Sequence, residues 1–305
     1  MSGPLVTLAF PCFNQARYVA EALRSLLAQT YTPLQIAISD DNSSDGTFKI
    51  IRELLQQYDG PHQVDVHRNT RRKGIENYNQ LMTMARGDFI VIAHSDDLSV
   101  PERVEKLTRA WQENSVSMVS SNSVIIDAQG REQGVRLDPG KFQQPDLEWY
   151  VRRGFNPAAI GACLAWDREV FDRFGSLDSR RSAVSSDVIL PFRACLLRGI
   201  FYLPDSLVYR RMHEASRSQM FLHLDNEEKL VTREAMLANR IAQFIYMFET
   251  VRTQLPDDDP RRSTLTKQLT RTIIMQAGKW AESRNRLLSK RKKNLWVDAD
   301  FRDST

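Results

Sequence analysis

The chain has 305 residues, of which 42% are hydrophobic and 26% charged, as is typical of a soluble globular protein with one large domain or a domain and an appendage. No basic segment followed by an apolar stretch opens the chain, and no apolar run approaches the roughly 18 residues of a membrane span. We therefore expect neither a signal peptide nor a transmembrane helix. The cysteines, Cys12, Cys163 and Cys195, lie far apart without C-x-x-C spacing, which predicts reduced thiols and a cytoplasmic location.

The net charge of +4 is unevenly distributed along the sequence. Residues 261–305 contain 12 Lys or Arg against 4 Asp or Glu, a local net charge of +8. Because the whole chain carries +4, the first 260 residues carry −4. The basic character therefore belongs to the C-terminal segment. No recognised nucleic-acid-binding module accompanies this charge, so we expect no nucleic-acid partner.

Short apolar runs alternate with helical patterns over the first 115 residues. Asn14 follows the first run and is expected to cap the next helix, and Ser99 with Pro101 predicts a similar helix start after the fourth run. Strands are expected at 5–10, 34–39, 64–67 and 89–92, and helices at 16–27, 48–58, 75–85 and 101–111. This repeated strand–helix order predicts a parallel sheet with helices on both faces.

The second part of the chain is less regular. Residues 130–156 contain Pro and Gly and are expected to form an irregular loop that faces an acceptor. The elements expected around this loop are strands at 117–127, 162–165, 200–203 and 207–209 and helices at 168–174 and 187–197.

Long helices are predicted after residue 220. Between 237 and 255, apolar residues step by four and three positions, a heptad-like stripe that either packs within the chain or forms a dimer seam. A second long helix is expected at 265–292. The sequence therefore predicts an α/β domain at 1–220 and a helical extension at 221–305.

The strand at 89–92 leads directly into His94, Ser95 and the adjacent carboxylates Asp96 and Asp97. Open α/β sheets bind ligands at the carboxyl ends of their parallel strands. Hard divalent cations prefer oxygen ligands and can share them with substrate phosphates. A desolvated pair of carboxylates also needs positive charge nearby, so this pair predicts a cation site.

Several motifs lie in register with one known family. They are Pro11-x-Phe13-Asn14, Ser39-Asp40-Asp41-Asn42-Ser43-Ser44-Asp45-Gly46-Thr47, Asn79 with Gly87, Ser95-Asp96-Asp97, Gly175-Ser176-Leu177-Asp178, Ser186-Asp187, and Tyr209-Arg210-Arg211-Met212-His213-x-x-Ser216-x-Ser218. Over about residues 5–220 the chain resembles family 2 glycosyltransferases of the GT-A fold. The resemblance implies a Rossmann-like, mostly parallel sheet flanked by helices, and residues 221–305 lie outside it.

The resemblance also implies a set of donor-binding residues. Asp41, in the turn after the second strand, would accept hydrogen bonds from the nucleotide base, and Asp40 is the alternative, as is a purely structural role in the turn. Asp96 would contact the ribose or share the metal, and cationic groups would stabilise the departing diphosphate. The implied donor-binding residues are Pro11, Phe13, Asn14, Asp40, Asp41, Asn79, Asp96, Arg210 and Arg211. Arg71, Arg72 and Lys73 are alternative groups for clamping phosphates, although such a charge run is typical of a solvated loop.

For the metal, Mn²⁺ or Mg²⁺, the resemblance implies Asp97 as a ligand, together with Asp96 and His213. His94 stands where many relatives have Asp. As a softer ligand it would suit Mn²⁺ better than Mg²⁺, and the alternatives are a role outside the coordination shell or plain packing. Capping or a loop position is the alternative for His213.

Asp187 falls where the family places its catalytic base. An inverting transfer needs one carboxylate to take the proton from the acceptor hydroxyl as that hydroxyl attacks the anomeric carbon. The alternative is that Asp187 only caps the helix that follows, and both roles are compatible.

These implications predict an enzyme that moves a sugar from a nucleotide-sugar donor, a UDP- or dTDP-sugar, to a hydroxyl of a glycan or lipid-linked acceptor. We expect a metal-assisted inverting displacement in bacterial surface polysaccharide biosynthesis. The alternatives are a sugar-phosphate nucleotidyltransferase, although residues 10–14 lack the glycine-rich phosphate loop it would need, and a catalytically inactive nucleotide-sugar-binding protein.

The C-terminal segment admits two interpretations. Its basic residues between 284 and 293 are flanked by Trp280 and Trp296, a pattern that suits peripheral contact with an anionic membrane surface on the cytoplasmic side. The alternative is a solvated basic face. A homodimer through the stripe at 237–255 is also left open.

Overall fold

The structure, a computed structural model, describes residues 3–137, 146–154, 156–178, 186–213 and 226–302. Its contacts divide the chain into two compact units, Met1–His213 and Glu214–Thr305. The domain boundary expected after residue 220 falls outside the described residues, so that boundary stays a prediction.

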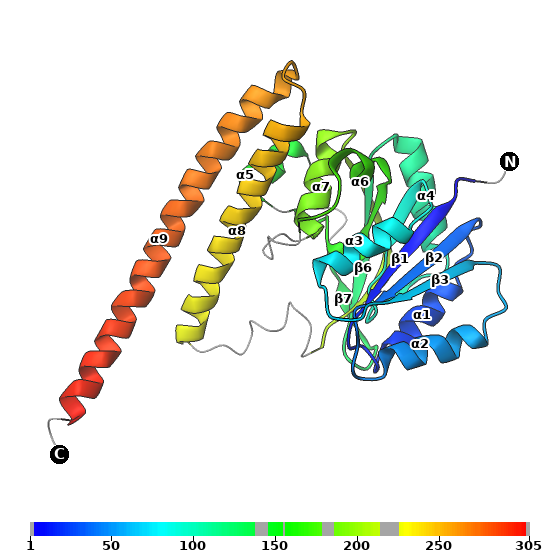
Figure 1. Cartoon of the computed structure of the whole chain (residues 1–305), viewed down its shortest axis with the longest axis horizontal. Coiled ribbons are helices and arrows are strands. Elements are labelled where there is room, and N and C mark those ends of the chain that lie inside the picture. The colour runs from blue at the N-terminus through cyan, green and yellow to red at the C-terminus, as the bar shows by residue number, and fades with distance from the viewer. Residues whose placement is uncertain (1–2, 138–145, 155, 179–185, 214–225, 303–305) are drawn as a thin grey trace. The chain divides into compact units, whose positions relative to one another are not determined.

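The first unit is built on a nine-stranded sheet that is flanked by helices (Figure 1). The strands are β1 (Val6–Cys12), β2 (Leu34–Asp40), β3 (Gln63–Arg68), β4 (Phe89–Ile92), β5 (Leu98–Ser99), β6 (Met118–Ile126), β7 (Glu132–Val135), β8 (Leu164–Asp167) and β9 (Ile200–Arg211). The helices are α1 (Val19–Leu27), α2 (Thr47–Gln56), α3 (Ile75–Met84), α4 (Arg103–Asn114), α5 (Leu147–Arg153), the 3₁₀ turn η2 (Gly161–Cys163), α6 (Glu169–Phe174) and α7 (Ser186–Leu196).

The strands are ordered β3-β2-β1-β4-β8-β6-β9-β5, and β7 pairs with β6. The first four strands are mutually parallel, as are β6 and β9. By contrast, β8 lies antiparallel to both β4 and β6. The predicted α/β class with a mostly parallel sheet is confirmed, and an antiparallel strand joins its two parallel parts.

The direction of strand order reverses between β1 and β4, because the chain moves outward through β2 and β3 and then returns. The apolar side chains of α1, α2 and α4 pack together against one face of β1, β2 and β4. On the other face, α3 lies against β1 and β2. Such a reversal leaves a crevice at the carboxyl ends of the strands, and it positions the candidate site.

Two helix starts differ from the expectation. Asn14 does not cap α1, because its backbone has a positive φ of 49° and its side-chain Oδ1 accepts a hydrogen bond from the Ser44 N–H. Helix α1 begins at Val19 instead. Ser99 belongs to β5, where it pairs with Val208 of β9, and α4 begins at Arg103. A distant segment thus uses the Asn14 side chain, whereas Ser99 is held in the sheet through its backbone and its hydroxyl accepts a hydrogen bond from Arg103.

The region expected to be an irregular loop contains regular structure. Strand β7 extends the sheet beside β6, and α5 follows within the same stretch; residues 138–145 and 155 lie outside the described part. The two short strands expected at 200–203 and 207–209 form the single long strand β9, which changes register against β6 at Ser121–Ser123. That irregularity lets β9 continue as a single strand, although the alternation of its side chains is interrupted locally.

The second unit consists of two long helices, α8 (Asn226–Gln254) and α9 (Pro260–Arg302), which pack against one another. The stripe expected at 237–255 lies on α8, and its members Phe244, Val251 and Leu255 are buried. Farther along, Arg284 of α9 forms an ion pair with Glu234 of α8 at 3.3 Å. The heptad-like pattern is therefore used, at least in part, within the chain. No described helix combines the length and the apolar character needed to cross a membrane.

Glycine is required at position 87, where the turn before β4 crosses the start of β1. The Gly87 N–H donates to Thr7 Oγ1 at 2.8 Å, and Thr7 in turn donates to Gln35 of β2. A methyl group at Gly87 would lie 2.5 Å from the Thr7 backbone nitrogen, closer than real contacts allow. The close approach of two backbones fixes the spacing of β1, β2 and β4 at this end.

We expect Gly87→Ala to destabilise the fold by about 2–3 kcal/mol, because overpacking forces the backbone of β1 to move. Thermal and urea unfolding measure this loss. Gly278→Ala is the matched control: no atom lies within 4 Å of a methyl group there, and alanine favours the interior of α9. Equal losses in the two variants would contradict the proposed contact.

Candidate active site

A cleft of about 290 Å³ opens at the carboxyl ends of β1, β2 and β4, where the strand order reverses. It is lined by residues from the segments that follow those strands and from the start of α3. The lining residues are Pro11, Cys12, Phe13, Asp41, Arg72, Gly74, Asn77, His94, Ser95 and Asp96. Five of the residues predicted from sequence thus meet in one place: Pro11, Phe13, Asp41, His94 and Asp96.

Asp41 lines this cleft, whereas its neighbour Asp40 does not. Asp41 Oδ1 accepts hydrogen bonds from Asn69 Nδ2 at 2.9 Å and from the Lys73 N–H at 2.8 Å. Its Oδ2 accepts one from the Gly74 N–H at 2.8 Å. Because a carboxylate has about four acceptor positions, Asp41 both holds the loop after β3 and keeps acceptor capacity for a ligand.

Asp40 is completely buried and serves the turn beneath the cleft. Its Oδ2 lies 3.3 Å from Arg68 Nε and accepts a hydrogen bond from the Ser43 N–H at 3.0 Å. Arg68 also donates to the Ser43 carbonyl. Of the two acids that the sequence left open, the cleft-lining one is Asp41, and Asp40 has the structural position.

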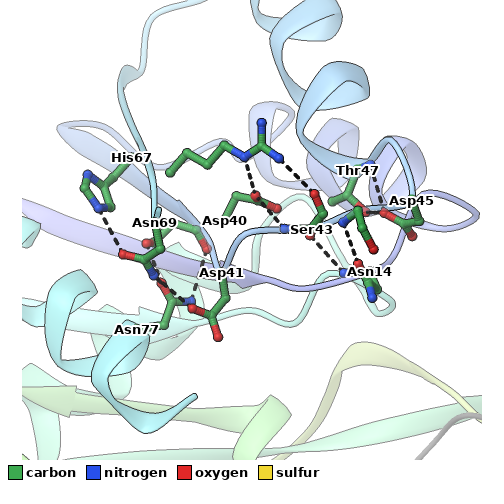
Figure 2. Close-up of polar contacts among 12 residues, drawn as sticks. Asn14, Asp40, Asp41, Ser43, Asp45, Thr47, His67, Asn69 and Asn77 are labelled. Carbon is green, nitrogen blue, oxygen red and sulfur yellow. Dashed lines mark hydrogen bonds and ion pairs between the residues drawn. The ribbon is translucent and has the colours of Figure 1, made fainter. Parts of the chain in front are cut away.

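The loops after β1 and β2 are tied together. The Asn14 N–H donates to Ser43 Oγ, and the Gln15 and Ala16 N–H groups donate to Thr47 Oγ1 and Asp45 Oδ2. Figure 2 shows this contact at one end of a polar network whose other end holds Asp41. The structure thus places Asn14 in a loop-to-loop clamp, and the cleft-lining members of its motif are Pro11 and Phe13.

Asn79 lies on α3 but does not line the cleft. Its amide exchanges two hydrogen bonds with the Leu177 backbone, at 2.8 and 2.9 Å, so its role in the structure is to hold the segment that precedes α7. The cleft-lining amide of α3 is Asn77, whose Oδ1 accepts hydrogen bonds from Ser39 Oγ and Asn69 Nδ2 (Figure 2). Asn77 and Asn69 were not predicted from sequence.

His94, Asp96 and Asp97 form a group of potential metal ligands. One ligand atom from each lies within 4.8 Å of the others. The turn that brings them together follows β4 directly and is closed by the Asp97 N–H, which donates to the His94 carbonyl. The oxygen-rich donor set with one imidazole fits Mn²⁺ or Mg²⁺, and it includes His94, whose participation the sequence left open.

The electrostatics of this group also fit a cation. Burial and the neighbouring Asp96 charge raise the pKa of Asp97 to about 8. A divalent cation would reverse this effect, because it favours the ionised carboxylate. The His94 ring is open to the cleft on one side, yet desolvation by the surrounding protein lowers its pKa. A neutral imidazole is the form that coordinates metals.

Arg211, at the end of β9, and His213, just after it, both contact the acidic turn. His213 Nε2 lies 3.1 Å from Asp96 Oδ2, so His213 is positioned through Asp96 beside the ligand group. The Arg211 N–H donates to Asp97 Oδ1 at 2.8 Å, and its side chain donates to the Asp96 carbonyl and to Glu21. Its guanidinium also lies over the Tyr18 ring. The buried Arg211 therefore supports the turn from behind, and the cleft lining does not include it.

Arg210 has the neighbouring position on the opposite face of β9. It is partly buried, and one of its guanidinium nitrogens lies 3.2 Å from Met212 Sδ. Its charge opposes the burial-driven rise in the pKa of Asp97.

Asp187, the expected base, is the second residue of α7 and lies across the turn η2 from His94. A methyl group on Gly161 would be 3.5 Å from His94 Cε1 and 3.6 Å from Asp187 Cβ. Both residues therefore approach the point that a side chain at position 161 would occupy. Asp187 also adds to the burial effect that raises the pKa of Tyr78. The chain thus brings Asp187 close to His94, although Asp187 is not among the residues that line the cleft.

Arg72 is a cleft residue that the sequence pattern assigned to a solvated loop. Its guanidinium lies over the Phe13 ring, 4.3 Å from the centroid. The Asp41 hydrogen bonds to Lys73 and Gly74 hold the segment that carries it. A charge run has no feature that identifies which member is held over an aromatic ring, so this contact depends on the tertiary structure.

The sheet and the position of its cleft define an α/β protein of the GT-A type. Residues 7–175 match the model of the family described as Glycosyl transferase family 2, and the chain belongs to this family. The predicted family and fold are therefore confirmed. An uncharacterized glycosyltransferase of Nostoc sp. is 25% identical over 221 residues, which cover 71% of this chain and 67% of that protein.

A second relative is the UDP-Glc:alpha-D-GlcNAc-diphosphoundecaprenol beta-1,3-glucosyltransferase WfgD of Escherichia coli. It is 27% identical over 129 residues, which cover 42% of this chain and 49% of that enzyme. This chain thus spans about two thirds of the Nostoc protein and about half of the E. coli enzyme. The activities of such relatives come to this chain only as proposals.

Two solved structures share the fold. TarS 1–349 of Staphylococcus aureus in complex with UDP gives a TM-score of 0.60 at 14% identity, covering 90% of this chain and 71% of that one. The mannosyltransferase PcManGT of Pyrobaculum calidifontis, in complex with GDP-Man and Mn²⁺, gives 0.57 at 17% identity, covering 99% and 81%. At these identities the likeness shows the fold alone.

Asp41→Asn and Asp40→Asn should separate ligand binding from turn stability. We expect Asp41→Asn to weaken the binding of UDP by at least about 10-fold, because the variant loses a charged acceptor in the cleft. Asp40→Asn should lower the stability of the fold by about 1–3 kcal/mol and leave UDP affinity unchanged, since Asp40 lies beneath the cleft. Calorimetric titration and thermal unfolding measure the two effects. Weaker UDP binding in Asp40→Asn would reverse the assignment.

Proposed function

We propose that this family 2 member transfers a sugar from a nucleotide-sugar donor to an acceptor hydroxyl by metal-assisted inverting displacement. The observation that carries the proposal is the grouping of His94, Asp96 and Asp97 at one end of a cleft, with Asp41 on the nucleotide side and Asp187 across η2. A nucleotide-sugar needs these functions in this order: a site for the base, a cation for the diphosphate and a base beside the acceptor.

For the nucleotide we propose a UDP-sugar, with a dTDP-sugar as the related alternative. Asp41 has acceptor capacity for the N–H group of a pyrimidine, and Phe13 with Arg72 offers a flat surface at the same end of the cleft. The bound UDP of TarS, which has the same fold, supports this choice.

For the cofactor we propose Mn²⁺ or Mg²⁺ held by Asp96 and Asp97, with His94 as a third ligand and His213 orienting Asp96. When bound, such a cation neutralises the diphosphate that leaves the sugar. The Mn²⁺ of PcManGT supports a divalent metal in this fold. Arg210, near the same group, would add positive charge on the diphosphate side.

For the chemical step we propose Asp187 as general base. Its carboxylate takes the proton of the acceptor hydroxyl, the hydroxyl oxygen forms a bond to the anomeric carbon, and the bond from that carbon to the diphosphate oxygen breaks. The leaving diphosphate needs no proton from an acid, so one carboxylate is enough. The position of Asp187 opposite the metal-ligand group supports attack from the face away from the diphosphate, with inversion.

For the acceptor we propose a glycan or lipid-linked sugar in bacterial surface polysaccharide biosynthesis. The relative from E. coli, whose name specifies a diphosphoundecaprenol-linked acceptor, supports this class. A cytoplasmic location and contact of the basic C-terminal segment with an anionic membrane surface would suit such an acceptor. Both stay predictions, as does a homodimer.

We expect Asp187→Asn to reduce transfer by at least about 10³-fold and to leave donor binding intact, because the amide cannot accept the proton. Product formation with a panel of nucleotide-sugars and the thermal shift caused by the donor measure the two effects. The matched control is Asp172→Asn, an exposed carboxylate on α6 that pairs with Arg168, and this variant should keep full activity. Unchanged turnover in Asp187→Asn would refute the base assignment.

Removal of divalent metal should abolish transfer, because no cation then neutralises the charge of the departing diphosphate. Addition of Mn²⁺ or Mg²⁺ should restore transfer. The measurement is activity after exhaustive dialysis against a chelator, followed by titration with each metal. We expect Asp97→Asn to need a much higher Mn²⁺ concentration for half-maximal recovery. Full activity in the metal-free protein would remove the metal from the mechanism.

A further inference from the structure

Arg103, the first residue of α4, is a charged side chain in the interior of the first unit. Only 1% of its surface is exposed, and it is among the largest fully buried side chains. Burying a guanidinium costs several kcal/mol, and an apolar side chain of similar volume is often as stable or more stable in such a place. The position of this charge therefore needs a reason other than packing.

The guanidinium of Arg103 bonds to three separate segments. Its Nη2 donates to the Ile92 carbonyl at 2.7 Å and to the Ala162 carbonyl at 2.8 Å, and its Nη1 donates to Ser99 Oγ at 2.9 Å. Within the described chain no carboxylate forms an ion pair with it. The planar group instead uses its fixed fork of donors on neutral oxygens, a geometry that the single ammonium of lysine cannot reproduce.

Two of these acceptors flank the candidate metal-ligand group in the sequence. Ile92 is the last residue of β4, two positions before His94, and Ser99 is two positions after Asp97. Arg103 therefore holds both ends of residues 93–98, which we name the ligand segment. That segment contains the three residues whose ligand atoms lie within 4.8 Å of one another.

The third acceptor, the Ala162 carbonyl, connects the ligand segment to η2, which lies next to the proposed base Asp187. Ala162 is the residue after Gly161 in η2, and Gly161 packs between His94 and Asp187. A shift of η2 would thus change the separation of the ligand segment from Asp187. Through one side chain, Arg103 connects the end of β4, the start of β5 and η2.

We propose that Arg103 is a positioning residue that fixes the ligand segment and η2 relative to one another, so that the metal ligands and Asp187 keep their spacing. The connection itself follows from the hydrogen bonds of this chain, and its consequence for metal binding rests on the proposed function. Arg103 forms no hydrogen bond or ion pair with the three ligand side chains in the described structure, so it positions them through the backbone. Its charge acts on them only through space, where it opposes the burial-driven rise in the pKa of Asp97 and adds to the desolvation that lowers the pKa of His94.

Hydrogen exchange tests the connection without any metal. We expect Arg103→Met and Arg103→Lys to raise exchange at least 10-fold at the hydrogen-bonded amides of Ala93 and Asp97 in the ligand segment, of Ser99 next to it and of Cys163 in η2. Amides in the middle of β1 and β2 should keep their protection. Unchanged exchange at the four amides, or an equal rise throughout β1 and β2, would overturn the proposal.

Arg193 provides a matched control. It is also 1% exposed, and it donates to the carbonyls of Gly175 and Ser176 in the same unit. Arg193→Lys should lower the thermal stability without raising exchange in the ligand segment. If the Arg103→Met variant does not fold, Ser99→Ala removes a single acceptor and should still raise exchange at Asp97 and Ser99; protection equal to the wild type would then overturn the proposal.

The second readout is the dissociation constant for Mn²⁺, measured with the full chain in the presence of UDP. Loss of a group that orients metal ligands typically weakens affinity about 10- to 100-fold, and we expect this change in both Arg103 variants but not in Arg193→Lys. An unchanged constant in the Arg103 variants would overturn the role in metal binding. A wild-type protein without Mn²⁺ affinity would instead contradict the proposed function, and the exchange experiment would still decide the role of Arg103.

Discussion

Two carboxylates, Asp96 and Asp97, stand together at the end of a buried strand, and the structure around them is arranged to keep them there. Burial and mutual repulsion work against two adjacent negative charges, as the raised pKa of Asp97 indicates. The compensation comes from several directions: a backbone N–H from Arg211, a hydrogen bond from His213 and the buried charge of Arg103. They come from the end of β9 and the start of α4, two segments far from each other in the sequence.

The end of the cleft that holds Asp41 is organised differently, because hydrogen bonds tie its carboxylate to neutral groups. Asp41, Asn69 and Asn77 form a hydrogen-bonded network (Figure 2), and Asp41 also accepts hydrogen bonds from the backbone of residues 73–74. Such a network costs little rearrangement when a ligand binds, since its side chains are already fixed. The end of the cleft that holds Asp41 is thus pre-formed, whereas the end beside Asp96 and Asp97 carries negative charge that a cation would neutralise.

Much of the fold could be predicted from the sequence, because β1, β2 and β4 are short apolar runs separated by helical patterns. The motifs after those strands also identified five of the ten residues that line the cleft. The antiparallel strand β8 and the long strand β9 were not predictable from local patterns, since a strand shows its own burial but not the direction of its partner. Local patterns also predicted that Asn14 and Ser99 cap helices, whereas Asn14 bonds to the distant Ser44 and Ser99 pairs with the distant strand β9.

Motif residues that were expected to touch the donor divide into two physical classes. Asp41 and Asp96 line the cleft, but Asn79 and Arg211 hold backbone of other segments, and a residue type alone does not distinguish these uses. An amide or guanidinium can serve either purpose, because both bind carbonyl oxygens as well as they bind ligands. Arg103 is a further residue of the second class. It lies outside every recognised motif, yet it bonds to residues on both sides of the Ser95-Asp96-Asp97 motif. The type of a polar residue beside a recognised motif therefore does not reveal its role, and its hydrogen-bond partners show whether it faces the cleft or holds the backbone of the residues that do.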